Sequence, residues 1–234
     1  MHLGILLQES LMSKVVLVVA AHTDDEALGC GGTLARHAAE GDIVHAVFMA
    51  DGVTSRQNRV ADDSALRHEA AEKARQIIGI SKNYYLCMPD NRLDSVLFLD
   101  VVQQLEPIIE LLNPEIIYTH HVGDLNIDHQ ITHRAVVTAC RPTPGHSVKE
   151  IYAFEVMSST EWASSSLAPF MPNHFVDISK FLNVKMASID AYALEMRDAP
   201  HSRSLLHIDS LAKHRGFSVG FQAAEAFMLV RALR

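Results

Sequence analysis

Cysteine is scarce in this sequence. Only three are present among 234 residues, at Cys30, Cys87 and Cys140, and none belongs to a C-x-x-C pair. An odd number of widely spaced cysteines argues against a disulfide framework and against a cysteine-rich zinc site. We therefore expect a reducing, cytoplasmic setting, in which any metal site is built from other side chains.

Long hydrophobic runs are also missing. No apolar stretch approaches the roughly 18 residues that a membrane-spanning helix needs, so we expect no membrane span. The opening "MHLGILLQES" has a short apolar patch and no basic start, which makes it a poor signal peptide. Because "MSKVVLVVAAH" begins cleanly at Met12, we expect residues 1–11 to be a flexible N-terminal extension.

Positive charge is the third shortage. The formal net charge is −8 and the basic residues are not clustered. This balance argues against nucleic acid and anionic membrane surfaces as partners. Hydrophobic residues make up 48% of the chain, which is enough to build one domain with an ample core over residues 1–234.

Strand-like and helix-like segments alternate along the chain. Continuous apolar runs such as "KVVLVVAA" are typical of strands buried on both faces, and amphipathic segments ending in glycine are typical of helices. This order predicts an α/β fold with a mainly parallel sheet and helices on both faces. The expected strands are 14–21, 42–50, 84–88, 114–120, 149–156 and 173–178, and the expected helices are 25–41, 64–79, 95–113, 128–141, 179–197 and 204–216.

Polar stretches follow several of the expected strands. Folds of this kind bind ligands at the carboxyl ends of their strands, so these stretches should share one rim of the sheet. This convergence predicts a functional site there. The stretches are His22–Glu26, Asp51–Arg59, Pro89–Arg92 and His120–His129.

The first stretch, "AHTDDEALG", combines a histidine with three consecutive carboxylates. His22 and Asp25 are three residues apart at an expected strand-to-helix turn, so both side chains could face one metal ion. Asp24 would project about 100° away and could reach a water molecule instead. Plain capping of the helix by acidic residues is the alternative interpretation.

The second stretch, "HHVGDLNIDHQITH", holds four histidines and two aspartates in 14 residues. A catalytic zinc takes three protein ligands, and His129 at the start of the expected helix is the candidate for the third. Asp128 could orient a neighbouring imidazole. A competing interpretation pairs His129 with His133 at i, i+4, but it leaves His22 unexplained.

Two motifs carry a resemblance to a known family. "AHTDDE" resembles the A/P-H-x-D-D-E motif of the LmbE/PIG-L family of zinc-dependent N-deacetylases, and "NIDH" resembles the second motif of that family, most often H-P-D-H. "LRHEAAEKARQIIG" and "LCMPDNRL" resemble further segments of such proteins. The resemblance implies a Rossmann-like three-layer fold and hydrolysis of an acetamide on a GlcNAc-type sugar or its glycoconjugate.

The resemblance also implies roles for individual residues. It makes His22, Asp25 and His129 the ligands of zinc, for which other divalent metals can substitute, and Asp24 the general base. In this mechanism Asp24 accepts a proton from a metal-activated water, which then attacks the acetamide carbonyl.

Further matches complete the expected catalytic site and reveal one departure. Arg67 matches an arginine near the substrate pocket, and Asp128 matches an aspartate that supports a histidine of the site. Many members have a histidine where this chain has Asn126, which can donate a hydrogen bond but cannot act as an acid. His201, in "APHSRS", is the candidate for a compensating histidine, and a solvent-facing loop histidine is the alternative.

The loop that follows the second strand supplies candidate substrate contacts. Asp51 and Arg56, with Arg59, are placed to bind sugar hydroxyls, and a solvated loop is the alternative. Trp162, the only tryptophan, could stack on a sugar, pack in the core or contact another subunit. A homo-oligomer remains open.

We carry three functional hypotheses. The first is a zinc N-deacetylase acting on a small N-acetylated sugar or glycoconjugate. The second is an amidase that cleaves a larger sugar–thiol conjugate and releases something other than acetate. The third is a non-catalytic α/β sugar- or nucleotide-binding module, which would not need Asp24.

Overall fold

The computed structural model describes residues 13–52 and 63–234 and is organised around a seven-stranded sheet. The strand order is β3-β2-β1-β4-β5-β7-β6, in which β1 to β5 are parallel and β7 runs antiparallel to both of its neighbours. The strands are β1 (Val15–Ala20), β2 (Ile43–Ala50), β3 (Lys82–Met88), β4 (Ile116–His120), β5 (Glu150–Phe154), β6 (His174–Asp177) and β7 (Ala224–Ala232).

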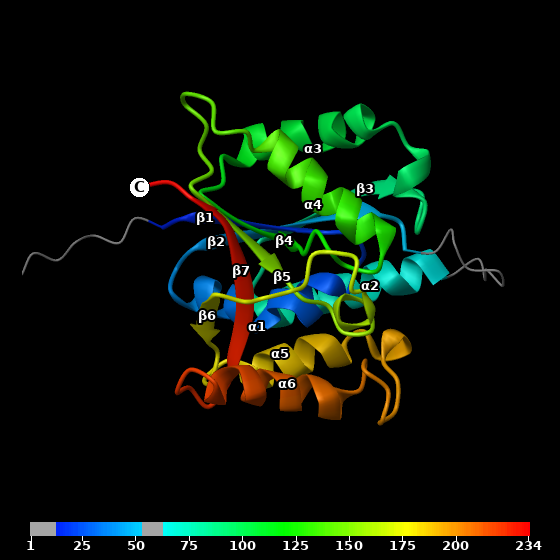
Figure 1. The fold of residues 1–234 in the computed structure, drawn as a ribbon, viewed down its shortest axis with the longest axis vertical. Coiled ribbons are helices and arrows are strands. Elements are labelled where there is room, and N and C mark those ends of the chain that lie inside the picture. The colour runs from blue at the N-terminus through cyan, green and yellow to red at the C-terminus, as the bar shows by residue number, and fades with distance from the viewer. Residues whose placement is uncertain (1–12, 53–62) are drawn as a thin grey trace, which may run out of the picture.

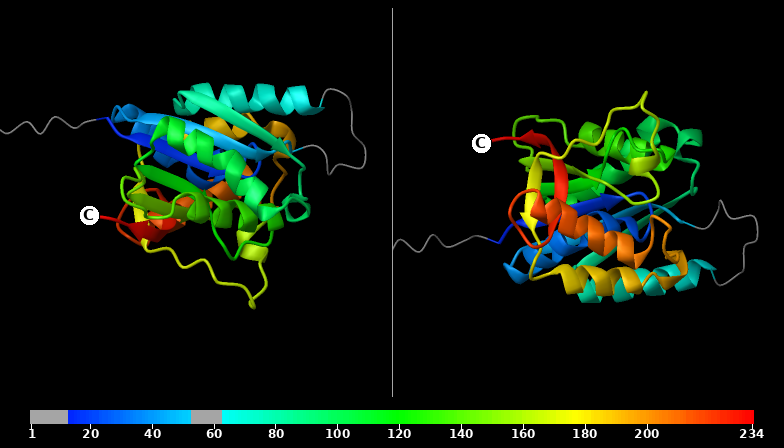
Figure 2. Two further views of the ribbon diagram at one scale, coloured as in Figure 1. Left: turned by 90° about the horizontal axis from the view of Figure 1, so that it is seen from above. Right: turned by 60° about the horizontal axis from the view of Figure 1, so that its bottom comes forward.

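Helices cover both faces of the sheet, which makes three layers (Figure 1). α3 and α4 lie on one face, and α1, α2, α5 and α6 lie on the other, with α5 and α6 next to each other (Figure 2). The helices are α1 (Asp25–Ala39), α2 (Asp63–Ile78), α3 (Phe98–Leu112), α4 (Ile127–Ala139), α5 (Leu182–Asp190) and α6 (Leu205–Phe217).

The apolar runs of the central strands explain this layering. In β1, Val16 and Val18 pack into the core beneath α1, while Leu17 and Val19 pack into the core beneath α3 and α4. Successive side chains of a strand point to opposite faces, so a strand covered on both sides must be apolar at every position.

The strand order places a ligand-binding crevice between β1 and β4. The chain leaves β1 toward β2 and β3 on one side and returns to β4 and β5 on the other. The connections therefore diverge at the carboxyl ends of β1 and β4, which is where doubly wound sheets bind ligands. His22 follows β1 and His120 ends β4, so both lie at this crevice.

The predicted fold class, a mainly parallel α/β sheet with helices on both faces, is confirmed, but the structure differs from the sequence-based expectation at two places. β7 was not expected: its first half is buried and its second half is partly exposed, so it shows neither a continuous nor an alternating pattern. The helix expected over 179–197 is shorter, because α5 ends at Asp190 and a separate 3-10 turn, Ala193–Glu195, follows. Pro107 lies inside α3, which continues past it to Leu112. Residues 1–11 lie outside the described residues.

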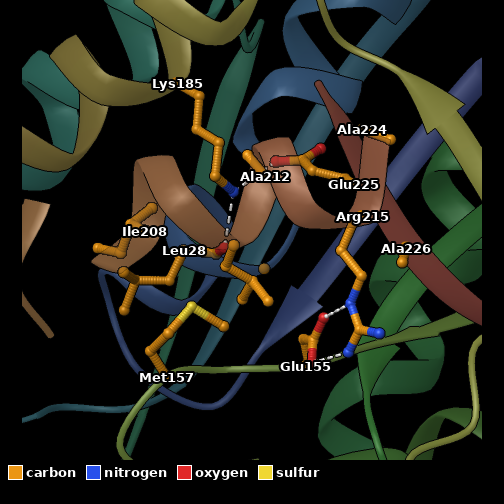
Figure 3. Close-up of a pocket in the computed structure, with 12 residues that line it drawn as sticks. Leu28, Glu155, Met157, Lys185, Ile208, Ala212, Arg215, Ala224, Glu225 and Ala226 are labelled. Carbon is orange, nitrogen blue, oxygen red and sulfur yellow. Dashed lines mark hydrogen bonds and ion pairs between the residues drawn. The ribbon is translucent and has the colours of Figure 1, made fainter. Parts of the chain in front are cut away.

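α1 is interrupted at Cys30, whose φ of −147° and ψ of 17° are not helical. The freed backbone groups are bound by two buried side chains, Lys185 and Glu225, which we call the helix-break pair (Figure 3). Lys185 Nζ donates to the carbonyls of residues 27 and 28 at 3.2 and 2.7 Å, and Glu225 accepts from the N–H groups of residues 32 and 33 at 3.0 and 2.6 Å. The two side chains also contact each other at 2.5 Å. The break thus separates the first turns of α1 from the rest of the helix.

Glycines allow α1 to approach the sheet closely at the break. A Cβ at Gly29 would lie 2.3 Å from the ring of Phe154, and one at Gly32 would lie 2.9 Å from Ile178. The "GCGG" segment is therefore explained by close packing of the helix on its neighbours rather than by nucleotide binding. In the part of the chain that the structure describes, no helix has the length and apolar character that crossing a membrane requires.

Candidate metal centre and catalytic cavity

His22 and Asp25 lie on either side of the turn that joins β1 to α1. Asp25 Oδ2 accepts a hydrogen bond from the backbone N–H of His22 at 2.9 Å and lies 3.3 Å from His22 Nδ1. Both side chains are buried. The strand-to-helix turn therefore points the imidazole and the carboxylate at the same point, as the three-residue spacing predicts.

His129, in the first turn of α4, completes the group. Its Nε2 lies 3.4 Å from Asp25 Oδ2, and the ligand atoms of His22, Asp25 and His129 all lie within 4.8 Å of one another. We call these three residues the metal trio. His133 does not join it, because its Nδ1 is hydrogen bonded to the carbonyl of His120 at 2.8 Å.

The metal trio fits a divalent cation. Two imidazole nitrogens and a carboxylate are a donor set that zinc and similar transition metals accept. Asp25 Oδ1 is buried, and no other described residue gives it a hydrogen bond. A buried carboxylate oxygen without a partner is costly unless a cation binds it, so this atom is an observation in favour of a metal.

A carboxylate holds the second nitrogen of His22. Asp128 Oδ2 lies 3.2 Å from His22 Nε2, and Asp128 also accepts from the backbone N–H groups of Asn91 and Leu93 at 2.7 and 3.0 Å. Asp90 lies 3.1 Å from the same nitrogen. His22, Asp90 and Asp128 also meet the distance requirement for a metal group. We favour the metal trio because both oxygens of Asp128 are already engaged by backbone donors.

A different carboxylate holds His129. Asp124 Oδ1 lies 3.2 Å from His129 Nδ1, and Asp124 also accepts from the hydroxyls of Ser159 and Thr160. Burial opposes the ionised form of Asp124, but His129, Ser159 and Thr160 outweigh it and lower its pKa to about 2. Each histidine of the metal trio thus lies 3.2 Å from its own carboxylate, an arrangement that favours one orientation of each ring. Asp124 is one of the two aspartates of "HHVGDLNIDHQITH", and its spacing in the sequence does not indicate this role.

His120, at the end of β4, is a further buried histidine beside the metal trio. Its Nε2 accepts from the backbone N–H of Ala21 at 2.8 Å, and its ring stacks on His129 with centroids 3.9 Å apart. Burial and the neighbouring His129 hold its pKa well below the usual value, so the ring is neutral. It therefore packs the metal trio from behind.

The pKa values of the metal trio are shifted because its histidines and carboxylates lie next to one another. Burial alone would lower the pKa of His129, but Asp25 and Asp124 raise it to about 9. Burial likewise opposes protonation of His22, yet its carboxylate partners keep its pKa well above the usual value. The pKa of Asp25 lies well below its usual value despite burial, because His129 and His22 stabilise the anion. Without a metal the group is held together by protons, which a divalent cation would replace.

Asp24 faces the other side of the same turn. Its φ of 117° lies in the left-handed region that residues other than glycine rarely adopt. Its Oδ2 accepts a hydrogen bond from Arg203 Nη1 at 2.8 Å. Burial raises the pKa of Asp24, the Arg203 cation opposes that shift, and Asp25 adds to it. Strained backbone of this kind is characteristic of functional positions.

Glu26, the third carboxylate of the motif, supports this conformation. It accepts a hydrogen bond from the hydroxyl of Tyr192 at 2.6 Å and another from the backbone N–H of Asp24 at 3.1 Å. Burial raises the pKa of Glu26 to about 7, although Tyr192 opposes that shift. Glu26 therefore braces the turn rather than binding the metal.

A polar cavity of about 220 Å³ opens above the metal trio. Arg67 lies on its wall, where each of its three nitrogens donates to Thr23 or to the carbonyl of Gly52, at 2.6 to 3.1 Å. Asn126 lines it too, but its Oδ1 accepts from Asp128 N at 2.8 Å and its Nδ2 donates to Asn91 at 2.9 Å. Asn126 is thus the cap of α4 as well as a wall of the cavity.

Other predicted residues lie away from this cavity. His201 is exposed and its ring contacts Trp162, which is itself 52% exposed, with centroids 5.8 Å apart. Asp51 is half-buried beside Gly52, which does line the cavity. Arg56 and Arg59 lie outside the described residues. Arg203, two residues from His201, lines the cavity, although its position in the sequence does not predict it there.

The fold and these side chains together define the class of protein to which this chain belongs. A Rossmann-like three-layer fold carries a buried His–Asp–His group and a polar cavity at the topological switch point of its sheet. Within that class, this chain belongs to the PIG-L family, described as GlcNAc-PI de-N-acetylase, which matches residues 17–140. That segment contains the whole metal trio and Asp24, and the resemblance found in the sequence is confirmed.

Individual relatives support the assignment. An uncharacterised deacetylase of Escherichia coli, YaiS, is 34% identical over 190 residues, which are 79% of this chain and 93% of that protein. A 4-oxalmesaconate hydratase of Pseudomonas putida is 26% identical over 77% of this chain and 73% of its own length. The solved N,N'-diacetylchitobiose deacetylase of Pyrococcus horikoshii shares the fold with a TM-score of 0.76 at 20% identity, covering 94% of this chain and 85% of that one.

Proposed function

We propose that this chain is a divalent-metal-dependent N-deacetylase that hydrolyses the acetamide of an N-acetylated amino sugar or its glycoconjugate. One observation carries the proposal. The ligand atoms of the metal trio converge within 4.8 Å, two of the three residues, His22 and His129, line a polar cavity, and the carboxylate of Asp24 is held on that cavity's wall. This arrangement provides a cation site and a separate proton acceptor side by side.

Roles follow for the residues at the floor of the cavity. His22, Asp25 and His129 would hold the cation, which supplies Lewis-acid chemistry that makes water and an amide carbonyl more reactive. Asp24 accepts the proton of the attacking water through its carboxylate, of which Arg203 engages only one oxygen. The C–O bond forms, the C–N bond breaks, and Asp24 passes the proton to the leaving amine, so acetate and a free amino sugar result.

The environment of Asp24 suits a group that both accepts and returns a proton. A general base works best when its pKa is near the working pH. Burial raises the pKa of Asp24 toward that range, and Arg203 limits the rise. The net effect is a raised pKa, which makes Asp24 a better proton acceptor than a free aspartate.

The cavity supports a sugar as the substrate. Charged and hydrogen-bonding side chains make up nearly all of its lining, and among them are Arg67, Asn91, Ser158 and Glu195. Such a wall binds hydroxyl groups rather than a hydrocarbon. YaiS and the P. horikoshii protein are both deacetylases by name, which agrees with this assignment.

Hydration of a double bond is the second candidate function. A relative that is 26% identical is named as a hydratase, and two guanidinium groups, Arg67 and Arg203, line the cavity. Two cations would suit a carboxylate-bearing substrate. Hydration also needs an activated water, but it releases no acetate, so product analysis separates the two functions.

The test combines metal analysis with product detection. Purified protein is assayed for bound metal and for acetate release from free, nucleotide-linked and lipid-linked N-acetylhexosamines, with an unsaturated carboxylate panel in parallel. We expect a stoichiometric divalent metal and acetate release, with both lost in His129→Ala. His146→Ala, which removes a partly exposed histidine outside the metal trio, is the control and should retain both. Metal retained in His129→Ala, or water added to an unsaturated acid without acetate release, would overturn the proposal.

A further inference from the structure

We infer that Arg203 is a substrate-contacting residue of this cavity, which holds one oxygen of Asp24 and donates its remaining N–H groups to an oxygen of the acyl group under attack. The inference rests on the proposed function, because it assigns the donor that an acyl-transfer reaction needs. It concerns a residue beyond the 17–140 segment that the family match covers.

The guanidinium of Arg203 is fixed at two of its three nitrogens. Nη1 donates to Asp24 Oδ2 at 2.8 Å, and Nε donates to Ser158 Oγ at 2.8 Å and to the carbonyl of Met157 at 3.4 Å. The side chain is 20% exposed and lines the cavity. Within the described residues, Nη2 has no hydrogen-bond partner. A rigid, charged donor therefore faces the cavity with unused hydrogens.

The other polar groups at this wall are already engaged. Asn126 uses its amide oxygen on Asp128 N and its amide nitrogen on Asn91. Arg67 donates from all three nitrogens to Thr23 and Gly52. Arg203 is thus the cation with a nitrogen to spare, and it lies next to the carboxylate that activates the water.

Amide hydrolysis creates negative charge on the acyl oxygen as the water adds. A fixed donor aimed at that charge lowers the barrier, and removing one such donor typically costs about 10²–10³ in kcat. A guanidinium remains charged throughout and can donate to two oxygens at once. Arg203 can therefore hold Asp24 with one edge and the acyl oxygen with the other.

The experiment compares metal-loaded wild type, Arg203→Ala and Arg203→Lys. In Arg203→Ala we expect kcat for acetate release to fall by about 10²–10³, with a smaller change in KM and with metal content unchanged. Added methylguanidinium should restore part of the lost kcat in Arg203→Ala. Arg203→Lys should remain impaired, because one ammonium group cannot span both positions.

Arg197→Ala is the matched control. Arg197 comes from the same segment and is exposed, and its guanidinium donates to the carbonyls of Leu194 and Met196. Its backbone N–H donates to the carbonyl of Arg203 at 3.2 Å, a bond that alanine keeps. This variant loses the same charge and should keep wild-type kcat. An unchanged kcat in Arg203→Ala, or a loss that follows metal content and gains nothing from methylguanidinium, would overturn the inference.

Acetate binding provides a readout that does not need turnover. We expect the dissociation constant of acetate, measured by calorimetry on the metal-loaded protein, to rise about tenfold in Arg203→Ala, which corresponds to the loss of about 1.4 kcal/mol. If the wild type releases no acetate but binds it through Arg203, the contact stands and the deacetylase assignment fails. If acetate release occurs and neither measurement depends on Arg203, the inference fails and the proposed function stands.

Discussion

Two groups of buried charged residues contact α1, and they differ in whether all of their polar atoms have hydrogen-bond partners. In the helix-break pair, Lys185 and Glu225 neutralise each other, and the carbonyls and N–H groups of the interrupted helix use their remaining bonding capacity. In the metal trio, Asp25 Oδ1 is buried and has no hydrogen-bond partner among the described residues. The complete group fits a structural role, and the incomplete one leaves a place for a ligand.

Because both groups contact the same helix, the helix-break pair can support the segment that carries Asp24 and Asp25. The helix-break pair binds the backbone around Cys30, five residues after Asp25, and fixes the end of the short segment that carries the motif. Fixed, charge-neutral support around a site is what holds reacting groups in position. Five predictions test the contrast, ordered from the largest expected effect to the smallest.

The largest effect should come from the proton acceptor. Asp24→Asn keeps the size of the side chain and tolerates the positive φ, but removes the base, so acetate release should fall by about 10²–10⁴. Metal content and melting temperature should stay close to wild type. Asp190→Asn, at the exposed end of α5, is the control. Wild-type turnover in Asp24→Asn would show that another group takes the proton.

Removing one partner of the complete group should cost stability instead. Lys185→Met leaves Glu225 as a buried, uncompensated charge, and we expect the free energy of unfolding in urea to fall by about 3–5 kcal/mol. Lys213→Met, which breaks an exposed pair with Asp209, should cost at most about 1 kcal/mol. Equal losses in the two variants would contradict a structural role for the helix-break pair.

The carboxylate behind His22 should tune metal affinity. Asp128→Asn removes the charge that orients the imidazole, so the dissociation constant of the metal should rise by about 10–100-fold. Competition with a chromophoric chelator measures this change. The reference variant is Asp94→Asn, which lies in the 3-10 turn nearby and is exposed. An unchanged affinity in Asp128→Asn would favour a purely structural role for Asp128.

The stability of the metal-free protein should depend on pH through the metal trio. The pKa of His129 is about 9 in the folded, metal-free protein, above its ordinary value of 6.5. The protonated ring therefore stabilises the metal-free fold below about pH 6.5, and this stabilisation is lost as the pH rises toward 9. Thermal unfolding of the metal-free protein should show that loss.

The affinity for the metal should change with pH in the opposite direction and increase as the pH rises. Because a ligating histidine must be neutral, binding at pH 7 should release protons, and affinity should increase up to about pH 9. Calorimetry in buffers of different ionisation enthalpy counts the protons. A binding enthalpy that is independent of the buffer would contradict the assignment of His129 as a ligand.

The sequence predicts those features that depend on residues close together in the chain. The turn after β1 places His22, Asp24 and Asp25 by their spacing alone, and the apolar runs of β1 and β2 identify them as buried parallel strands. β7 could not be recognised, because its burial changes along its length and its partners, β5 and β6, lie 47 or more residues earlier in the chain.

Long-range contacts account for what the sequence did not reveal at the site. Arg203 reaches Asp24 across 179 positions of sequence, and no spacing rule relates the two. His201, its neighbour, was the expected residue because a histidine can replace a histidine, but the segment turns its ring toward Trp162 instead. Likewise, two aspartates near α4 were visible, and only the folded structure assigns Asp124 to His129 and Asp128 to His22.

The positive φ of Asp24 constrains how this protein can evolve. Glycine, asparagine and aspartate tolerate such a backbone conformation best, while a β-branched or bulky residue would distort the turn that also carries Asp25. A lineage that abandoned catalysis but retained ligand binding therefore has few substitutions open to it at this position. We expect asparagine or glycine there in non-catalytic descendants, which makes this single residue a marker for separating enzymes from binding proteins among relatives.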